Sequence, residues 1–174
     1  MEKAFLDPYW VLKQINLNSY MTAADFGAGS GGWAIPLAKE LEDGKVYAVD
    51  LLEEPLSSLR AKAKIAKVLN IEIVLADVEK GTKIFKNSCD LVLMTNLLFQ
   101  CEDKEKIFEE AKRIMKKGAK LLVVDWKKDS FLGPKEEEKV LPEKAKELAQ
   151  KYDFKLEKEL EAGSYHYALL FTKD

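Results

Sequence analysis

The stretch Asp25-Phe26-Gly27-Ala28-Gly29-Ser30-Gly31-Gly32 is the densest cluster of glycines in this 174-residue chain. Its glycines follow a short apolar segment, residues 23–26, that is typical of a β-strand. Apolar residues at helical spacing follow it, from Trp33 to Leu41. Glycine permits a tight turn and lets the backbone approach a ligand, and the start of a helix offers free N–H groups. The stretch therefore predicts a strand–loop–helix unit whose loop binds a ligand.

Strands and helices alternate along the rest of the chain. Further strands are predicted at residues 45–50, 71–76, 90–95 and 119–126, and further helices over residues 55–69 and 103–117, the second ended by Gly118. Near-continuous apolar strands that alternate with helices indicate a parallel sheet covered on both faces. A helix over residues 142–152 and two strands, 154–160 and 165–172, end the chain in a hairpin, so one strand is expected to run antiparallel.

These segments predict an α/β fold with a seven-stranded, mostly parallel sheet. We expect a single domain over residues 1–174, in which residues 1–21 form an N-terminal helix, beginning at Asp7-Pro8, and a linker.

Composition bounds the classes of function. Hydrophobic residues make up 47% and charged residues 33%, which excludes a disordered chain. The net charge of −2 and the scarcity of Arg, only Arg60 and Arg113, disfavour a nucleic-acid partner. No apolar segment approaches the roughly 18 residues of a membrane helix, and Met1–Ala4 lacks the pattern of a signal peptide. Cys89 and Cys101 form no disulfide framework. We therefore expect a cytoplasmic protein without a membrane span, and the oligomeric state stays open.

The glycine loop fits more than one class of ligand. Gly27, Gly29 and Gly32 match the G-x-G-x-x-G pattern of dinucleotide-binding proteins. The same loop also matches the pattern acid-x-G-x-G-x-G, through Asp25, Gly27, Gly29 and Gly31. A tight turn with a purely structural role is the third interpretation.

Two acids at the ends of successive predicted strands help to decide which ligand the glycine loop binds. Asp50 lies 23 residues after Gly27, where an acid is placed to bind both hydroxyls of a ribose, although it also fits the start of a helix. Asp77 ends the next strand, and its carboxylate with the N–H of Val78 is placed to bind the edge of an adenine. The terminal hairpin, and the lack of residues for a substrate domain, argue against a nicotinamide-dependent reductase.

Taken together, these segments resemble the class I S-adenosylmethionine-dependent methyltransferases, from about residue 21 to residue 172. The small type 11 group, whose relatives include quinone-biosynthesis C-methyltransferases, is the most similar. The matching segments are residues 25–31, 46–50, 76–77, 90–94 and 116–124, with Ala119 where such proteins usually have a second glycine. The resemblance implies a three-layer Rossmann-like fold with strand order 3-2-1-4-5-7-6, and methyl transfer from S-adenosylmethionine.

The resemblance also implies which residues bind the cofactor. The glycine loop would pass beneath the methionyl group, with Asp25 near its amino group. Asp50 would bind the ribose, Leu51 would pack on the adenine, and Asn96 would lie beside the sulfonium. The full set is Asp25, Gly27, Ala28, Gly29, Gly31, Asp50, Leu51, Asp77, Val78 and Asn96.

No catalytic motif or metal-binding cluster is present in the sequence, and methyl transfer requires none, because the cofactor already carries an activated group. Ligands of parallel sheets bind at the carboxyl ends of the strands. Asn96, Asp125 and His166 are therefore the candidate catalytic residues. With Trp126 and Tyr165 they form the candidate substrate wall. The alternatives are that His166 is a hydrogen-bonded strand residue and that Trp126 only packs.

We expect the acceptor to be a small molecule. A thiol-bound metalloid is disfavoured, because Cys89 and Cys101 are expected about 20 Å apart at opposite ends of one strand. The charged segment Lys127–Leu141 is a candidate lid, or else an ordinary solvated loop. The alternative functions are a nicotinamide-dependent reductase and a scaffold that holds the cofactor without turnover.

Overall fold

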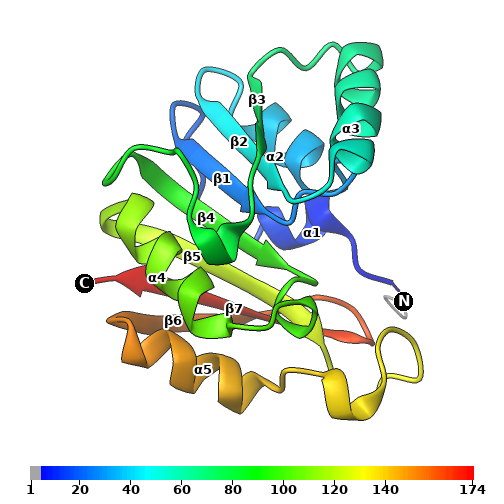
Figure 1. The fold of residues 1–174 in the computed structure, drawn as a ribbon, viewed down its shortest axis with the longest axis vertical. Helices are drawn as coiled ribbons and strands as arrows, with labels where there is room; N and C mark the ends of the chain where they lie inside the picture. The colour runs from blue at the N-terminus through cyan, green and yellow to red at the C-terminus, as the bar shows by residue number, and fades with distance from the viewer. Residues whose placement is uncertain (1–4) are drawn as a thin grey trace.

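The computed structural model describes residues 5–174, so the expectation for Met1–Ala4 lies outside the described residues. Seven strands form one sheet in the order β3-β2-β1-β4-β5-β7-β6 (Figure 1). Five strands are parallel: β1 (Thr22–Phe26), β2 (Lys45–Asp50), β3 (Ile71–Leu75), β4 (Cys89–Thr95) and β5 (Met115–Trp126). The terminal hairpin consists of β6 (Phe154–Leu160) and β7 (His166–Lys173), with β7 antiparallel to both of its neighbours. This arrangement confirms the predicted fold and strand order.

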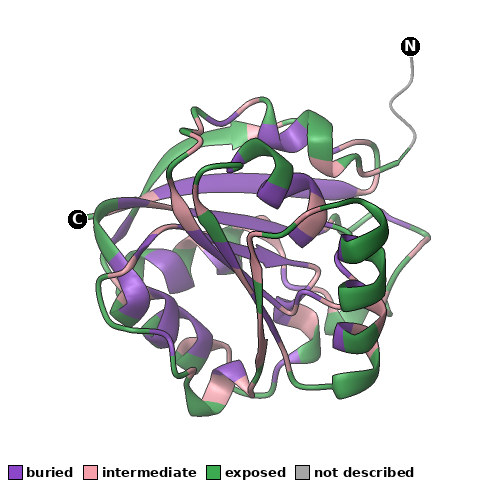
Figure 2. Ribbon diagram, turned by 90° about the horizontal axis from the view of Figure 1, so that it is seen from above, coloured by how far each residue is buried: buried purple, intermediate pink, exposed green. Residues whose placement is uncertain are grey.

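Helices cover both faces of the sheet. One face packs against α1 (Pro8–Leu12), α2 (Ala34–Glu40) and α3 (Glu53–Ile65). The other packs against α4 (Lys104–Ile114) and α5 (Pro142–Lys151). Three short 3₁₀ turns, η1 (Val78–Lys80), η2 (Leu98–Gln100) and η3 (Glu136–Glu138), lie in the connections. Figure 2 shows the central strands largely buried, while the flanking helices expose one side to solvent.

Local sequence explains where two of the helices begin. The Asp7 carboxylate accepts a hydrogen bond from the N–H of Tyr9 at 3.0 Å, and Pro8 occupies the first helical position of α1. Asp103 plays the same role for α4, where it accepts from the N–H of Glu105 at 3.1 Å. These side chains satisfy N–H groups that have no partner inside the helix.

The prediction that α4 continues to residue 117 is wrong. The helix ends at Ile114, and Met115 already belongs to β5, where it is fully buried and pairs with Cys89. A register shift between Cys89 and Leu91 accommodates the extra residues, and Gly118 sits inside the strand with a φ of +75°. The apolar pattern of the helix continued into Met115, so only the long-range pairing with β4 determines where the helix ends.

The predicted helix over residues 55–69 is displaced toward the N-terminus. It begins at Glu53 and ends at Ile65, and Lys67 has a φ of +56° that is incompatible with a continued helix.

An ion pair between the buried Glu110 and the exposed Arg113 fixes the segment that follows β3. Glu110 on α4 accepts hydrogen bonds from the N–H and the hydroxyl of Thr82, at 2.7 and 2.6 Å. Arg113 donates to both oxygens of the same carboxylate, each at 2.7 Å. Burial raises the pKa of Glu110, but the bonds from Arg113 and Thr82 outweigh burial and leave the pKa below its ordinary value.

Glu110→Gln is expected to lower the free energy of unfolding by about 1–3 kcal/mol at neutral pH, because the buried carboxylate that bonds to Arg113 and Thr82 loses its charge. Since the folded pKa lies below the ordinary 4.5, this contribution is complete above pH 4.5 and is lost as the pH falls further. Urea unfolding at neutral and acidic pH measures both effects. The control is Glu109→Gln, whose exposed pair with Lys106 should contribute less than about 0.5 kcal/mol. A Glu110 variant as stable as the parent at neutral pH would contradict the account.

Candidate functional site

A cavity of about 340 Å³ lies at the carboxyl ends of β1, β2 and β3, beside the glycine loop. It adjoins the point between β1 and β4 where the strand order reverses, the usual ligand site of open parallel sheets. The cavity is lined by Gly27, Gly29, Asp50, Leu51, Leu52, Pro55, Ala76, Asp77, Val78, Glu79, Leu97, Gln100 and Cys101.

Two glycines of the loop expose their backbone to this cavity. Gly27 has a φ of +73°, and a Cβ added there would lie 2.9 Å from Leu97 Cδ1. Gly29 has a φ of +53° and open space around its Cα, and its N–H donates to Asp50 Oδ2 at 2.8 Å. Both φ values favour glycine. The loop is therefore bare backbone where it faces the cavity.

Ala28 and Gly31 serve the packing of the loop and do not line the cavity. Ala28 is buried, and its N–H donates to Val49 O at 2.9 Å. A Cβ at Gly31 would lie 3.0 Å from Leu59 Cγ on α3. The third glycine of the motif thus allows close contact between the loop and α3.

The Asp50 carboxylate joins the glycine loop to the start of α3. One oxygen accepts from Gly29, and the other accepts from the N–H of Leu52 at 3.0 Å. The alternative prediction, that Asp50 caps the start of a helix, is wrong: α3 begins at Glu53, and its N-cap is Leu52, which makes no side-chain cap. A carboxylate has about four acceptor positions, so Asp50 keeps acceptor capacity on the cavity side.

Asp77 and Val78 form the opposite wall with η1. Asp77 accepts from the N–H of Glu79 at 3.0 Å and pairs with Lys80 at 3.0 Å. The hydrogen bond from Lys80 is the main reason that the pKa of Asp77 is lowered, so this carboxylate is ionised. Leu51 projects at the mouth of the cavity with 61% of its surface exposed.

Asp25 is a buried acid at the base of the glycine loop. It is 1% exposed, and neither carboxylate oxygen has a hydrogen-bond partner within residues 5–174. Burial, and then the charge of Asp50, raise the pKa of Asp25 to about 8. The Ala34 N–H lies close enough to oppose this shift without completing a hydrogen bond. A buried carboxyl group has a raised pKa of this kind when no cation or hydrogen-bond donor beside it stabilises the ionised form.

Among the described residues, buried side-chain nitrogen and oxygen atoms without a partner occur only at one edge of the sheet. They belong to Asp25, Asn96, Asp125, Trp126 and His166, at the carboxyl ends of β1, β4 and β5 and the start of β7. Buried polar groups almost always have partners in folded proteins. Their concentration at this edge indicates a place where a ligand or water completes the hydrogen bonding.

Asn96 lies just beyond β4 and outside the lining of the cavity. It has a φ of +51°, unusual for a residue other than glycine. Its N–H donates to Val124 O at 2.8 Å, and its carbonyl accepts from Gln100 Nε2 at 2.6 Å, which leaves the side-chain oxygen unpartnered. The backbone of Asn96 is thus held from both sides.

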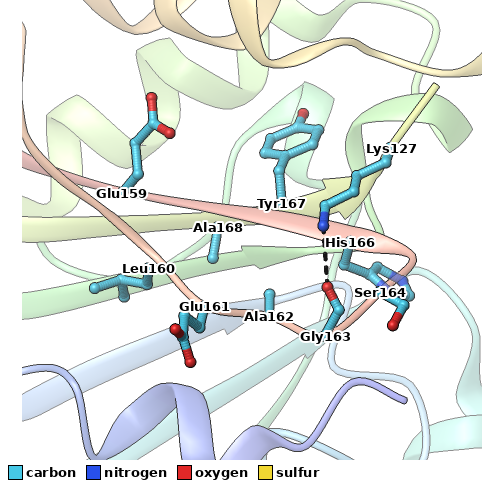
Figure 3. A pocket seen from close by; sticks show the side chains of 10 residues that line it. All are labelled: Lys127, Glu159, Leu160, Glu161, Ala162, Gly163, Ser164, His166, Tyr167 and Ala168. Carbon is cyan, nitrogen blue, oxygen red and sulfur yellow. Dashed lines mark hydrogen bonds between the residues drawn. The ribbon is translucent and has the colours of Figure 1, made fainter. Parts of the chain in front are cut away.

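The sheet divides the predicted substrate wall. Side chains alternate along a strand, so Asp125 lies with Tyr167 on the face of α4 and α5, while Trp126 and His166 lie on the face of α1 to α3. Figure 3 shows the same alternation at the hairpin, where Tyr167 and Ala168 point to opposite sides. Tyr165 lies outside both sets and contacts Phe131.

Both predicted acid–base candidates have shifted pKa values. Burial raises the pKa of Asp125 to about 6, against the lowering effect of the N–H groups of Trp126, Leu98 and Phe99. Only the Trp126 N–H makes a full hydrogen bond, at 2.8 Å to Oδ1. Burial and the nearby charge of Lys127 lower the pKa of His166 to about 4. His166 is therefore neutral near pH 7.

A larger cavity, of about 620 Å³, lies at the β6–β7 hairpin. His166 and Lys127 line it, together with residues 159–164 (Figure 3). It has no glycine loop and no acid at the end of a parallel strand. Chemistry rather than size therefore favours the smaller cavity as a nucleoside site.

Residues 24–123 match the sequence model of the methyltransferase domain family. The chain belongs to this family. Its membership confirms the methyltransferase class, the enzymatic nature of the protein and S-adenosylmethionine as the cofactor that the sequence predicted.

Solved structures support the membership. An S-adenosylmethionine-dependent methyltransferase from Aquifex aeolicus is 28% identical, with a TM-score of 0.90, and the match covers 98% of this chain and 91% of that one. Among curated proteins, an uncharacterized protein of Methanocaldococcus jannaschii is 33% identical over 66% of this chain and 49% of its own length. A demethylmenaquinone methyltransferase of Oceanobacillus iheyensis is 26% identical over 70% of this chain and 51% of its own length. The chain thus spans about half the length of these curated relatives.

Within residues 5–174, every helix is too short or too polar to cross a membrane.

Seven residues that line the cavity are outside the predicted cofactor-binding set. Four of them lie within four positions of a predicted residue in the sequence, so extending each predicted contact by a few positions finds them: Leu52, Pro55, Ala76 and Glu79. Gln100 lies in η2, and Leu97 and Cys101 flank it; the sequence predicts residues 97–101 at the carboxyl end of β4, and only the tertiary fold determines which of them line the cavity.

Proposed function

We propose that this methyltransferase transfers a methyl group from S-adenosylmethionine to a small molecule, with the cofactor bound in the cavity beside Gly27. The observation that carries the proposal is the hydrogen bond from the Gly29 N–H to the Asp50 carboxylate. It places a carboxylate that can accept further hydrogen bonds beside the glycine backbone, and both residues line the cavity. That arrangement fits a ribose with two hydroxyl groups. Asp77 and the N–H of Val78 suit an adenine, because they offer an acceptor and a donor on one wall.

Asp25 fits the methionyl ammonium of the cofactor. Its carboxylate has no partner within residues 5–174, and a cation beside it would restore its ionised form. We assign Ala28 and Gly31 to shaping the loop, and Asn96, with its side-chain oxygen unpartnered, to the neighbourhood of the sulfonium.

S-adenosylmethionine supplies an activated methyl group when bound. The residues of this chain therefore need only bind, orient and exclude water. Asp50 and Asp77 would fix the nucleoside, and the strained backbone of Asn96 would fix the end of β4 against the reacting atoms. Asp125 and His166 stay candidates for contact with the acceptor from opposite faces of β5.

The name of the Oceanobacillus iheyensis relative supports a small-molecule acceptor. The net charge of −2 gives no general attraction to nucleic acid. Two buried, unpaired thiols, Cys89 and Cys101, support a reducing, cytoplasmic location. We also keep the proposal that residues 1–174 form a single domain.

The segment Lys127–Leu141 is proposed as a lid. Lys139 Nζ bonds to the carbonyls of Lys128 and Ser130, at 3.1 and 2.6 Å, and Tyr167 Oη bonds to Val140 O at 2.7 Å. These bonds make the segment a folded unit anchored near its C-terminal end. S-adenosylhomocysteine is expected to slow proteolysis within this segment, and unchanged cleavage would contradict the lid.

Calorimetric titration tests the proposed cofactor. S-adenosylmethionine and S-adenosylhomocysteine should bind with one site per chain, and NADH and NADPH should not bind. Binding of a nicotinamide cofactor alone would favour the reductase. Methylated product from a candidate acceptor separates the enzyme from a scaffold.

A further inference from the structure

Leu97 covers the first glycine of the glycine loop. It follows Asn96 just beyond the end of β4, and β4 lies next to β1 in the sheet. A Cβ added at Gly27 would lie 2.9 Å from Leu97 Cδ1 and 3.7 Å from Leu97 Cγ, so the leucine side chain occupies the space directly against this glycine. Leu97 is only 7% exposed, although it lines the cavity. It therefore forms an apolar wall of the cavity at the end of β1.

The cavity stops short of the residues that we assign to the methionyl group. Its lining includes Asp50 and Asp77, which suit a nucleoside, but neither Asp25 nor Asn96. Both carboxylate oxygens of Asp25, and Asn96 Oδ1, are buried without a hydrogen-bond partner among residues 5–174. Asp25 is 1% exposed, so a ligand cation cannot reach its carboxylate in this conformation. The nucleoside site is thus open, whereas the methionyl site is closed.

The hydrogen bonds of the η2 turn run mainly within the turn and its flanking residues. The N–H of Gln100 donates to Leu97 O at 3.0 Å, and the Gln100 side chain donates to Asn96 O at 2.6 Å. Cys101 Sγ donates to Leu97 O at 3.4 Å, a weak bond because a thiol is a poor donor. The N–H of Asn96, by contrast, is bonded to Val124 on β5. Beyond Asn96, therefore, the turn can shift without breaking the hydrogen bonds of the sheet.

A second position for the turn is available on the side of β5. Asp125, near the end of β5, has one carboxylate oxygen, Oδ2, without a partner in the described part of the chain. The N–H groups of Leu98 and Phe99 lie close enough to lower the pKa of Asp125, but neither completes a hydrogen bond. Because β4 lies between β1 and β5, a shift of η2 that completes these bonds also carries Leu97 away from Gly27. One movement would then satisfy a buried carboxylate and remove the apolar wall.

We propose that Leu97 is a gate between the nucleoside cavity and the methionyl site, and that a shift of η2 toward Asp125 opens it. The inference rests on the proposed function. The nucleoside would bind first, in the open cavity, and the methionyl group would then displace Leu97 and reach Asp25. The pairing of its ammonium with Asp25, together with the new bonds to Asp125, would offset the cost of this displacement. A nucleoside without the methionyl group gains nothing from the displacement and leaves the gate closed.

Adenosine and S-adenosylhomocysteine test the gate, because they share the nucleoside and only the second carries the amino-acid group. Each is titrated into the full chain, labelled with ¹⁵N, and the backbone amide resonances of Leu98 and Phe99 are followed. S-adenosylhomocysteine is expected to move both amide protons downfield, because they gain hydrogen bonds to a carboxylate. Adenosine at saturation is expected to leave them near their positions in the free protein.

Two truncations measure what the gate costs. Leu97→Ala removes the side chain that lies against Gly27, so S-adenosylhomocysteine should bind about tenfold more tightly, whereas adenosine should gain no affinity. The control, Leu98→Ala, shortens a fully buried leucine of the same turn that does not line the cavity, and it should tighten neither ligand. Calorimetry measures the affinities, and circular dichroism checks that each variant is folded. The amide measurement uses the parent protein, so it decides the matter even if a variant misfolds.

The outcomes separate the gate from the proposed function. If S-adenosylhomocysteine binds and leaves the Leu98 and Phe99 resonances unmoved, the gate is overturned and the cofactor site stands. Equal shifts with adenosine would assign the movement to the nucleoside and also overturn the gate. Equal gains of affinity for both ligands in Leu97→Ala would overturn it too, because Leu97 would then only narrow the cavity. If S-adenosylhomocysteine does not bind at all, the proposed function fails, and the gate fails with it.

Discussion

Asp50→Ala is expected to weaken the binding of S-adenosylhomocysteine about 100-fold or more. Two hydrogen bonds from ribose hydroxyls to a charged acceptor contribute roughly 1.5–3 kcal/mol each. The substitution also removes the bonds to the N–H groups of Gly29 and Leu52, which hold the loop against the start of α3. Calorimetry measures the affinity, and circular dichroism checks the fold.

Two further variants make the Asp50 result specific. Asp50→Asn keeps one acceptor oxygen without the charge and should lose about tenfold. Asp43→Ala removes an exposed acid that accepts from Ser19 before β2, far from the cavity, and should leave the affinity unchanged. A folded Asp50→Ala protein that binds as tightly as the parent would show that the cofactor lies elsewhere.

Asp25→Asn is expected to stabilise the protein in the absence of cofactor. The pKa of Asp25 rises from 3.8 to about 8 on folding, so between these values folding must take up a proton. Stability therefore falls as the pH rises from about 4 to about 8. An amide needs no proton and should gain roughly 2–4 kcal/mol at pH 7. Asp125 contributes in the same direction up to about pH 6, so some pH dependence will persist in the variant.

The same Asp25→Asn substitution is expected to weaken S-adenosylhomocysteine binding by about 10- to 100-fold. In the parent protein a methionyl ammonium would lower the pKa of Asp25, and near pH 7 binding should release about one proton. Calorimetry in two buffers of different ionisation enthalpy measures that release. A variant that is neither more stable nor weaker in binding would contradict the role of Asp25.

Sequence patterns succeeded where short-range chemistry decides the structure. The glycine loop was predictable because positive φ values at Gly27 and Gly29 require that residue type. Alternating strands and helices predicted the layers, and family resemblance supplied the strand order. Asp50 and Asp77 were placed correctly at the cavity because parallel strands end at one edge.

The errors arose where distant segments meet. The end of α4 at Ile114 depends on the pairing of Met115 with Cys89, which no local pattern contains. A local rule was also overlooked: the predicted substrate wall grouped Asp125 with Trp126, although neighbouring residues of a strand face opposite sides. Gly31 matched a binding motif but is needed for contact with Leu59. The positions of Gln100 and Cys101 follow from η2, a turn set by tertiary packing.

A crystal structure of the complex with S-adenosylhomocysteine tests the central claim most directly. We expect both ribose hydroxyls within about 3 Å of the Asp50 carboxylate. We also expect the adenine between Leu51 and Val78, and the methionyl ammonium beside Asp25. Density for the ligand in the hairpin cavity, or a ribose without contact to Asp50, would contradict the account.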